Sequence, residues 1–597
     1  MDKQDIIETP IWGLYEKGRN FHRRTGIYTD TDRNYQFYNG NQWEGAKLGE
    51  VEPVQKNFIR PIVRYKLAVI HDNLYAINYS SQNHESKQFI ELADRYCKML
   101  NSRANKIWER DQMDKKLRAV TKDAAINSEG IIYVTYDVEK GLPVNEVVDK
   151  SDIYYGNEND PDIQAQPYIL IRKRMSVSNA MDFALAHGAS EADLEYIIGD
   201  NDNFDEAGEA AKEELDDAVT VVYKLYRKDG TVHYSIATRY IEIVNDADIG
   251  LSLYPVAHMV WEDKKGSARG EGEVKYLIPN QIEVNRTEIR RVLTVKYQAH
   301  PHRVVDTLKI ANPEDLNRVG STIKTNGQPV DDVLKAVGVI QPAMMSPDVV
   351  KLQEDLIQMT RELAGAGETA TGQVNPEDAS GRAILAVQQA SQAPMTEQRE
   401  ACKYFIEDIG RIWLEYIVAY AEGGITLEEE AIDPMTGAET IRLVNVPQSA
   451  LERLQADVKI DITPKGVYDR FAQEQTLENF LINGMFNVEK LPELKVYVES
   501  LDDDSVAPKR KLEKIVKRME QTQLKIAITQ AQGQLMQQNA QQFLMGDPDQ
   551  QAAQISDARL ALMAEQAAAE EAPIEGEEEY AEKEAELDEQ VDVPEEE

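Results

Sequence analysis

Apolar residues at helical spacing dominate the early part of the chain. Between residues 54 and 125, two series of apolar side chains recur every three or four positions, which is the stripe that a helix buries. We therefore expect helices over most of this segment, continuing to Asn127. The first series is Ile59, Ile62, Val63, Leu67, Ile70 and Leu74, and the second is Phe89, Leu92, Tyr96, Leu100 and Ile107.

The periodicity then changes to that of strands. Short runs rich in β-branched and aromatic residues, bounded by Gly, Asp, Asn or Pro, predict a sheet. Arg227-Lys-Asp-Gly230 predicts a hairpin, because Asp-Gly readily adopts positive φ. A helix near Ser178–His187 and an acidic stretch, 191–217, complete a mixed helix and sheet unit of 265 residues. The strand-like runs are 130–136, 168–172, 219–226 and 231–236.

Two helices of similar length flank a small insert in the middle of the chain. The first, roughly Val274 to Gln298, follows the Gly-rich segment 266–272. The insert, His300 to Pro342, is rich in Pro and Gly and contains two strand-like pieces, 303–305 and 337–340. The first helix carries one apolar face, made of Ile278, Ile282, Ile289 and Leu293.

The second helix begins at Ser346-Pro-Asp348. Ser is a capping residue, Pro suits the first turn, and an early acid complements the helix dipole. The helix stops at Gly365-Ala-Gly367. Its apolar residues, spaced by three and four, are Val349, Leu352, Leu356, Met359 and Leu363.

The remainder predicts a loop, helices and an acidic tail. The loop, 368–380, precedes a long helical pattern, 381–422, that Pro394 should kink or interrupt. A strand pair, 440–446 with 457–462, follows. Residues 466–545 read as helical and end in a Gln-rich segment, 521–542, which predicts either a short helical barrel or a partly disordered tail. From Glu570 to Glu597 there are 15 acidic residues and one lysine, so we expect disorder there.

Composition excludes several classes of protein. The 597 residues hold 66 Lys and Arg against 105 Asp and Glu, a net charge of −39, which argues against a surface that clings broadly to nucleic acid or to anionic membranes. Two cysteines cannot form a disulfide framework. The N-terminus lacks a secretory signal, and no run reaches the roughly 18 apolar residues of a membrane span. We expect a soluble protein made inside a cell.

Sequence motifs for catalysis, cofactors or metals are weak. Gly367-Glu-Thr-Ala-Thr-Gly372 has the spacing of a phosphate-binding loop, but Gln373-Val374 replaces the required Lys-Ser/Thr. His300 and His302 could offer two imidazoles to a metal, yet no third ligand has suitable spacing. We therefore expect no enzyme activity, no cofactor and no metal site.

Two basic clusters contrast with the acidic background. The first lies along the first central helix and into the insert, and it is a candidate contact to DNA or to another subunit. For the second, a solvated helix face with internal ion pairs is the simpler interpretation. The first comprises Arg286, Arg290, Arg291, Lys296 and Arg303, and the second Lys509, Arg510, Lys511, Lys514, Lys517 and Arg518.

From about Tyr35 to Glu422, the chain resembles the portal proteins of tailed bacteriophages, particularly the short-tailed group. The order of the elements (helix, insert, helix, Gly-Thr loop, kinked helix) carries the resemblance together with local motifs. These motifs are Tyr38-Asn-Gly-Asn-Gln-Trp43, Asn57-Phe-Ile-Arg-Pro-Ile-Val63, Pro279-Asn-Gln-Ile-Glu-Val-Asn285, His300-Pro-His-Arg-Val-Val305, Glu362-Leu-Ala-Gly365 and Ser380-Gly-Arg-Ala-Ile384.

The resemblance implies an α+β fold, mostly helical, with a wing, stem, clip and crown arranged in a ring oligomer. The implied parts are a wing (1–265), a first stem helix (266–299), a clip (300–345), a second stem helix (346–365), a tunnel loop (366–380), a kinked long helix with wing strands (381–465), crown helices (466–545) and an acidic disordered tail (546–597).

The resemblance also implies a function and partners. The protein would form a dodecameric ring at one capsid vertex of the virion, after assembly in the host cytoplasm, as a conduit for packaging and ejecting double-stranded DNA without reading its sequence. Its partners would be the terminase large subunit, a head-tail adaptor or tail proteins, and the major capsid and scaffolding proteins. The loop facing DNA would contain Glu368, Thr369, Thr371, Gln373 and Asn375, and the clip contact would contain Pro301, His302 and Arg303.

Two other functions compete with this interpretation. A DNA-packaging ATPase would need the phosphate-binding lysine that is missing, and a nuclease would need a metal-binding acidic cluster. The acidic tail and Gln-rich segment would suit a scaffolding or assembly factor. However, such a factor has no need of the mixed domain or of the helix-insert-helix unit, so the portal interpretation is favoured.

Overall fold

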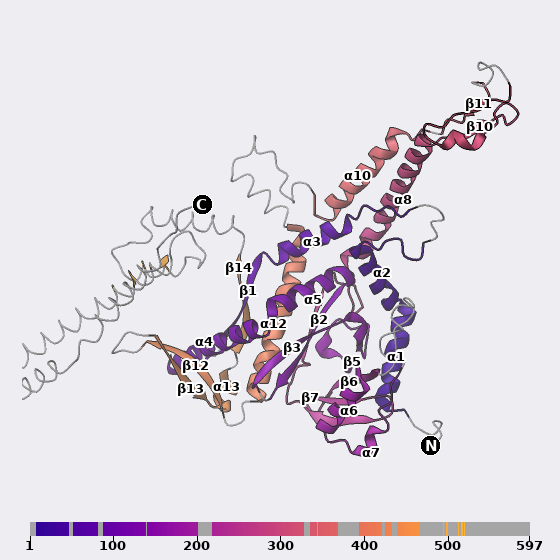
Figure 1. The fold of residues 1–597 in the computed structure, drawn as a ribbon. Helices are drawn as coiled ribbons and strands as arrows, with labels where there is room; N and C mark the ends of the chain where they lie inside the picture. Colours follow the sequence, from indigo (N-terminus) through magenta and orange to yellow (C-terminus); the bar gives the residue numbers. More distant parts are fainter. Residues whose placement is uncertain are drawn as a thin grey trace, which may run out of the picture. The chain divides into compact units, whose positions relative to one another are not determined.

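The computed structural model describes residues 8–46, 52–81, 87–138, 140–200, 218–327, 335–342, 344–367, 393–420, 424–432, 439–454 and 456–464, with isolated positions beyond 493. The chain divides into two compact units, residues 1–471 and 472–597. Every element below belongs to the first unit, which mixes helices and strands and confirms the α+β class (Figure 1).

Five helices form the N-terminal part. They are α1 (Pro10–Thr25), α2 (Ile27–Asn39), α3 (Ile59–Ile70), α4 (Lys87–Arg110) and α5 (Met113–Asn127). The helices expected over 54–127 are confirmed with one exception: Leu74 belongs to strand β1 (Asn73–Ser81). The helical spacing failed there because the two residues after α3 form a turn, and alternate residues Tyr75, Ile77 and Tyr79 then become buried as in a strand.

Two antiparallel sheets follow. The first has the order β3-β2-β9 and the second the order β4-β5-β6-β7-β8. Asp229 and Gly230 both have positive φ, so the predicted hairpin between β6 and β7 is confirmed. The strands are β2 (Glu129–Asp137), β3 (Leu142–Val148), β4 (Ile153–Tyr155), β5 (Tyr168–Ser176), β6 (Ala218–Lys228), β7 (Thr231–Ala237), β8 (Glu242–Asp248) and β9 (Val256–Val260).

Shorter helical elements accompany these sheets. The 3₁₀ turns η1 (Lys150–Asp152) and η2 (Ile163–Ala165) flank β4. Helix α6 (Val177–Ala186) is capped by Ser176, packs on β5 and β6, and confirms the helix expected near residues 178–187. Helix α7 (Glu191–Leu194) comes next.

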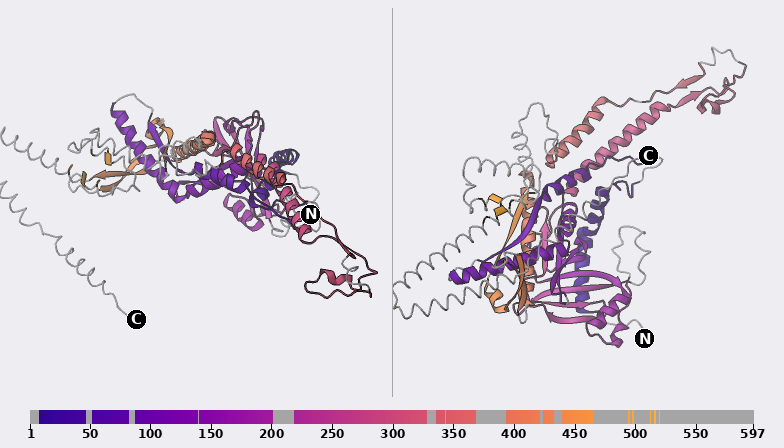
Figure 2. Two further views of the ribbon diagram at one scale, coloured as in Figure 1. Left: turned by 90° about the horizontal axis from the view of Figure 1, so that it is seen from above. Right: turned by 60° about the vertical axis from the view of Figure 1, so that its left-hand side comes forward.

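The predicted helix-insert-helix unit is present. Helix α8 (Glu273–Ala299) packs along α10 (Pro347–Leu363), and Ser346 caps α10 by accepting a hydrogen bond from the Asp348 backbone N–H. Strands β10 (Arg303–Val305) and β11 (Val337–Val339) pair antiparallel between them, with η4 (Pro313–Asn317) in the insert. We call α8 and α10 the stem pair, and residues 300–345 the insert. Figure 2 shows the insert continuing the stem pair away from the sheets.

The C-terminal elements correct one prediction. Pro394 lies in the 3₁₀ turn η5 (Ala393–Met395), and α12 (Thr396–Ala419) begins after it. Strands 440–446 and 457–462 exist but do not pair with each other. Instead β13 (Glu439–Val446) pairs with β12 (Ile425–Ile432), and β14 (Ala456–Pro464) pairs with β1, almost 400 residues earlier. Helix α13 (Gln448–Leu454) separates β13 from β14.

One large core joins helices and sheets. Helix α12 packs across β9, β2 and β3, and α5 packs on β2. Trp413 of α12 is fully buried and its Nε1 donates to Asn145 Oδ1 at 2.9 Å, while the Tyr416 hydroxyl donates to the Val134 carbonyl at 3.0 Å. Helix α12 is therefore part of the same core as α2, α3, α4 and α5.

A buried ion cluster lies where the stem pair leaves this core. Glu129, the first residue of β2, has a fully buried side chain within 3.2 Å of Lys150 Nζ and 3.5 Å of Arg269 Nη1. Arg269 Nε donates to Glu158 Oε2 at 2.8 Å, and Arg269 Nη2 donates to His22 Nε2 at 2.8 Å. Burial alone would raise the pKa of the Glu129 carboxyl, but Arg269 and Lys150 outweigh it and hold the pKa well below its usual range.

Arg269 stands four residues before α8, so the cluster fixes the root of the stem pair. A second, half-buried ion pair lies nearby in the sequence: Lys66 Nζ of α3 lies 2.6 Å from Oε2 of Glu273, the first residue of α8. Between them, a Cβ on Gly272 would lie 2.8 Å from the Ile126 carbonyl oxygen. Only glycine permits this close approach of the α8 start to the end of α5.

The cluster makes a first prediction. Arg269→Met leaves the buried Glu129 and the half-buried Glu158 with too little positive charge. Removing one partner of a buried pair costs about 3–5 kcal/mol of unfolding free energy. Urea unfolding followed by tryptophan fluorescence should show this loss. The matched control is Lys275→Met, which removes an exposed cation paired with Glu271 and should change little. Equal midpoints for the two variants would contradict this role for Arg269.

A second prediction concerns pH. Burial, and then the Arg269 charge, hold the pKa of His22 well below 6.5. The unfolded chain takes up a proton near pH 6.5 and the folded chain does not. The contribution of His22 to the free energy of unfolding is therefore complete above that pH. It is lost as the pH falls, by at most about 1.4 kcal/mol per pH unit.

The measurement is urea unfolding between about pH 5 and pH 8 for the wild type and for His22→Gln, which keeps a hydrogen-bond acceptor. The wild type should lose more stability on acidification than the variant. Asp152, whose pKa burial raises to about 6, acts in the opposite direction but in both proteins alike. Parallel pH profiles would show that His22 does not titrate in this way.

Candidate functional site

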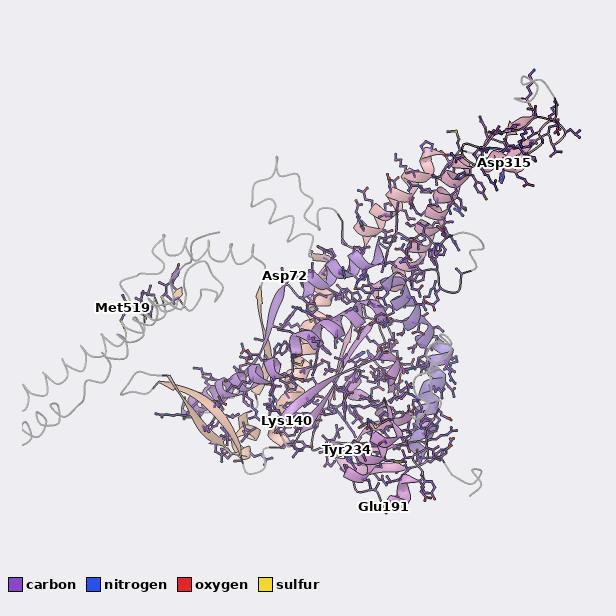
Figure 3. All side chains as sticks on the ribbon, viewed as in Figure 1. Asp72, Lys140, Glu191, Tyr234, Asp315 and Met519 are labelled. Atoms are coloured by element: carbon purple, nitrogen blue, oxygen red, sulfur yellow. The ribbon has the colours of Figure 1, made fainter. Side chains whose placement is uncertain are left out.

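The stem pair and insert contain most of the predicted site residues that the structure describes. Figure 3 marks Asp315 in the insert, beyond the ends of α8 and α10. The predicted loop residues Glu368, Thr369, Thr371, Gln373 and Asn375 lie outside the described residues. So do the second basic cluster, the Gln-rich segment and the acidic tail.

The two stem helices meet along a polar seam. Asn280 Nδ2 donates to Thr360 Oγ1 at 3.0 Å, and Gln353 Nε2 donates to Glu288 Oε2 at 2.9 Å. Arg291 Nη1 donates to Gln353 Oε1 at 2.9 Å. Gln353 and Thr360 are both buried, so the contact between the helices depends on directional hydrogen bonds as well as on apolar packing.

The apolar stripe of α10 lies to the side of this seam. Leu352, Met359 and Leu363 are 67%, 59% and 85% exposed, whereas Leu356 is half-buried. Most of this stripe is therefore not buried within one subunit. The physical reason is that Gln353 and Thr360, one residue away on the helix, satisfy the polar groups of α8 and turn the stripe outward. On α8, Ile278 is buried near the root, while Ile289 and Leu293 farther along are only half-buried.

The stem cations predicted from the sequence all have acidic neighbours. Arg286 and Arg290 each lie 3.6 Å from a Glu283 carboxylate oxygen. Arg291 pairs with Glu288 at 3.2 Å, and Lys296 lies 3.9 Å from Glu52. Because their charges are partly neutralised, these cations form ion pairs along the helix rather than an uncompensated basic patch.

The insert places its three predicted contact residues directly after α8. Pro301 is half-buried, and His302 and Arg303 are exposed. The His302 ring lies 5.8 Å from the Tyr297 ring, and the Arg303 guanidinium donates to the Leu316 carbonyl. Leu308, Val319 and Ile340 are exposed in the same insert, as are Val304 of β10 and Val339 of β11.

Three sequence motifs that lie far apart in the chain meet at the root of the stem pair. Gln281 Oε1 accepts from the Phe58 backbone N–H at 3.0 Å, and its Nε2 donates to the Lys56 carbonyl at 2.8 Å. Asn285 Nδ2 donates to Gln42 Oε1 at 2.5 Å. The motifs 38–43, 57–63 and 279–285 thus form one buried hydrogen-bond network, a positioning role that the sequence alone did not reveal.

The acidic pocket beside α12 does not have the geometry of a metal centre. It encloses about 410 Å³ and includes Trp261 and Tyr404 in its wall. Burial raises the pKa of the Asp408 carboxyl there. Within the residues that the structure describes, no group of three His, Cys, Asp or Glu could hold a metal ion. The pocket's carboxylates are Asp162, Asp263, Glu397, Glu400 and Asp408.

Comparison with known proteins identifies the family. The phage P22-like portal protein family matches residues 183–572, well over half of the chain, including the stem pair, the insert and α12. No curated protein matches the chain. Among the described helices, none combines the length and apolar character needed to cross a membrane. With the helix-insert-helix unit and the family match in agreement, the chain belongs to the phage P22-like portal protein family.

Proposed function

We propose that this protein forms a closed ring at one vertex of a phage capsid, with no catalytic activity of its own. The ring is a conduit through which double-stranded DNA enters and leaves, and twelve subunits is the number that we expect. One observation carries the proposal. Hydrogen bonds of polar side chains join α8 to α10, and the apolar stripe of α10 stays exposed.

The uncovered stripe favours contact with another copy of the chain. Burying a leucine or methionine side chain gains about 1.5–3 kcal/mol, so three such residues per subunit favour association. A contact between different faces of neighbouring subunits generates a ring when the rotation closes. The half-buried Ile289 and Leu293 of α8 supply a second apolar surface that a neighbour could cover.

The negative net charge of the chain favours a channel through which DNA passes without being held. Duplex DNA carries one negative charge per about 1.7 Å, and a channel lined with many cations would hold it tightly. The net charge of −39 limits such attraction. We assign the DNA-facing loop to Glu368, Thr369, Thr371, Gln373 and Asn375, whose side chains are mostly small or neutral.

The insert is the proposed contact for the packaging motor and the tail. Pro301, His302 and Arg303 lie at its base, beside the exposed Leu308 and Ile340. In this proposal the terminase large subunit binds during packaging and a head-tail adaptor replaces it. The wing faces the major capsid and scaffolding proteins, and residues 466–545 form a crown.

Ring assembly supplies the third prediction. Leu352→Lys with Met359→Lys places two charges on the apolar stripe and should reduce the ring to monomers or small oligomers, because desolvating them at an interface is costly. Light-scattering mass and negative-stain electron microscopy measure the result. Gln358→Lys, an exposed position on the same helix, is the matched control and should form rings. Rings from the double variant would exclude this stripe as an interface.

The loop supplies the fourth prediction. Deleting Thr369–Gln373 should leave ring assembly intact but impair the retention or passage of DNA. Replacing the same five residues with Gly and Ser controls for loop length. The readouts are ring mass and the DNA content of assembled particles. Loss of rings on deletion would show that the segment holds subunits together instead.

A further inference from the structure

A second basic surface lies on α3 and α5, away from the cations that the sequence singled out. Arg60 and Arg64 are exposed on α3, one turn apart. Arg118 is exposed and Lys122 half-buried on α5, again one turn apart. The two helices pack against each other, as Figure 1 shows. We call these four residues the α3–α5 cations.

A shared aromatic ring brings one cation of each pair together. The Arg60 guanidinium lies 5.9 Å from the centre of the Tyr38 ring, and Lys122 Nζ lies 5.3 Å from the same centre. Lys122 also lies 5.9 Å from the centre of the Tyr35 ring. Aromatic faces favour cations and hold them in place without cancelling their charge. The end of α2 therefore supports both cations on one surface.

The α3–α5 cations differ from the stem cations in their neighbours. Among the described residues, none of the four has a carboxylate within ion-pair distance, whereas Arg286, Arg290, Arg291 and Lys296 all do. Burial raises the pKa of the adjacent Asp123 carboxyl and the Lys122 charge partly offsets this, so Lys122 is partly compensated even without an ion pair. In a chain with a net charge of −39, three arginines and this lysine still form a local positive potential. A polyanion would neutralise it.

The surroundings favour phosphates over an acidic protein. No large apolar side chain is exposed on α3 or α5, both of which are described throughout. Protein interfaces depend on buried aromatic or aliphatic anchors, which this surface lacks. Three of the four cations are arginines, whose planar groups bind phosphate oxygens in a bidentate manner.

We propose that the α3–α5 cations form a binding site for the phosphate backbone of duplex DNA, without sequence preference. The site extends the proposed conduit, on which the choice of DNA as ligand rests. It lies on α3 and α5 and contains none of the stem cations. A few cations give weak, salt-sensitive contacts that guide DNA without retaining it.

The test is fluorescence anisotropy of a labelled duplex of about 30 base pairs with the full-length protein, at about 50 to 200 mM KCl. The variant R60Q/R64Q/R118Q/K122Q should bind at least about tenfold more weakly. Its slope of log K against log salt should be smaller by about 2–4, since each lost phosphate contact removes about 0.9. R60Q/R64Q, which changes only exposed residues, should show about half the effect. It tests the proposal even if the quadruple variant does not fold.

The charge-matched control is K275Q/R286Q/R290Q/K296Q, which removes four stem cations that have acidic partners. It should stay within about twofold of the wild type. An unchanged salt slope in the α3–α5 variants, or an equal loss in the stem variant, would overturn the proposal. Polyglutamate that binds the wild type as tightly as the duplex, and loses binding in the same variants, would reassign the surface to an acidic protein.

Ring mass, measured on every variant, separates this inference from the proposed function. Rings in all variants with DNA binding lost only in the α3–α5 variants support both. If the protein forms no ring but those variants still lose DNA binding, the binding site is supported and the proposed ring is excluded. If the α3–α5 variants form rings and bind DNA as the wild type does, the proposed conduit stands and the proposed binding site is excluded.

Discussion

The desolvated carboxylate of Glu129 is the constraint on which the placement of the stem depends. A buried charge is tolerated only when cations and hydrogen bonds surround it, and these come from Lys150, His258 and Arg269 in three different segments. Arg269 in turn binds His22 of α1 and Glu158. Arg269 Nη2 also donates to the Ile153 carbonyl of β4 at 2.9 Å. These contacts join α1, both sheets and the segment before α8 around one buried carboxylate.

Polar contacts hold the stem pair together inside the subunit, while apolar side chains remain exposed for contacts between subunits. Inside the subunit, hydrogen bonds at Gln281, Asn285 and Gln353 hold α8 to the body and to α10. Because those bonds need a fixed geometry, they set the rotation of α10 about its axis. That rotation turns Leu352, Met359 and Leu363 outward. The surface available for assembly is thus a consequence of how the polar residues are satisfied internally.

Local elements could be predicted from the sequence, but long-range partners could not. Spacing and capping residues placed α8 and α10 within one or two residues, since those signals are local. The pairing of β14 with β1 escaped prediction because no local pattern links strands so far apart. Glu129 gave no sign of burial at the start of a strand, and Arg269 lay in a Gly-rich segment that looked only flexible. Glu283, three and seven residues before Arg286 and Arg290, could have indicated that the stem cations are paired.

The same contrast explains why the basic surface on α3 and α5 was missed. A run of basic residues is visible in a sequence, whereas Arg60 and Lys122 are brought together only by packing on Tyr38. Clusters visible in the sequence tend to carry compensating acids on the same helix, as α8 does, because nearby opposite charges stabilise a helix. The α3–α5 cations come from two helices and, among the described residues, form no ion pair with a carboxylate. In an acidic protein, positions where folding alone assembles positive charge are therefore the better candidates for contact with a polyanion.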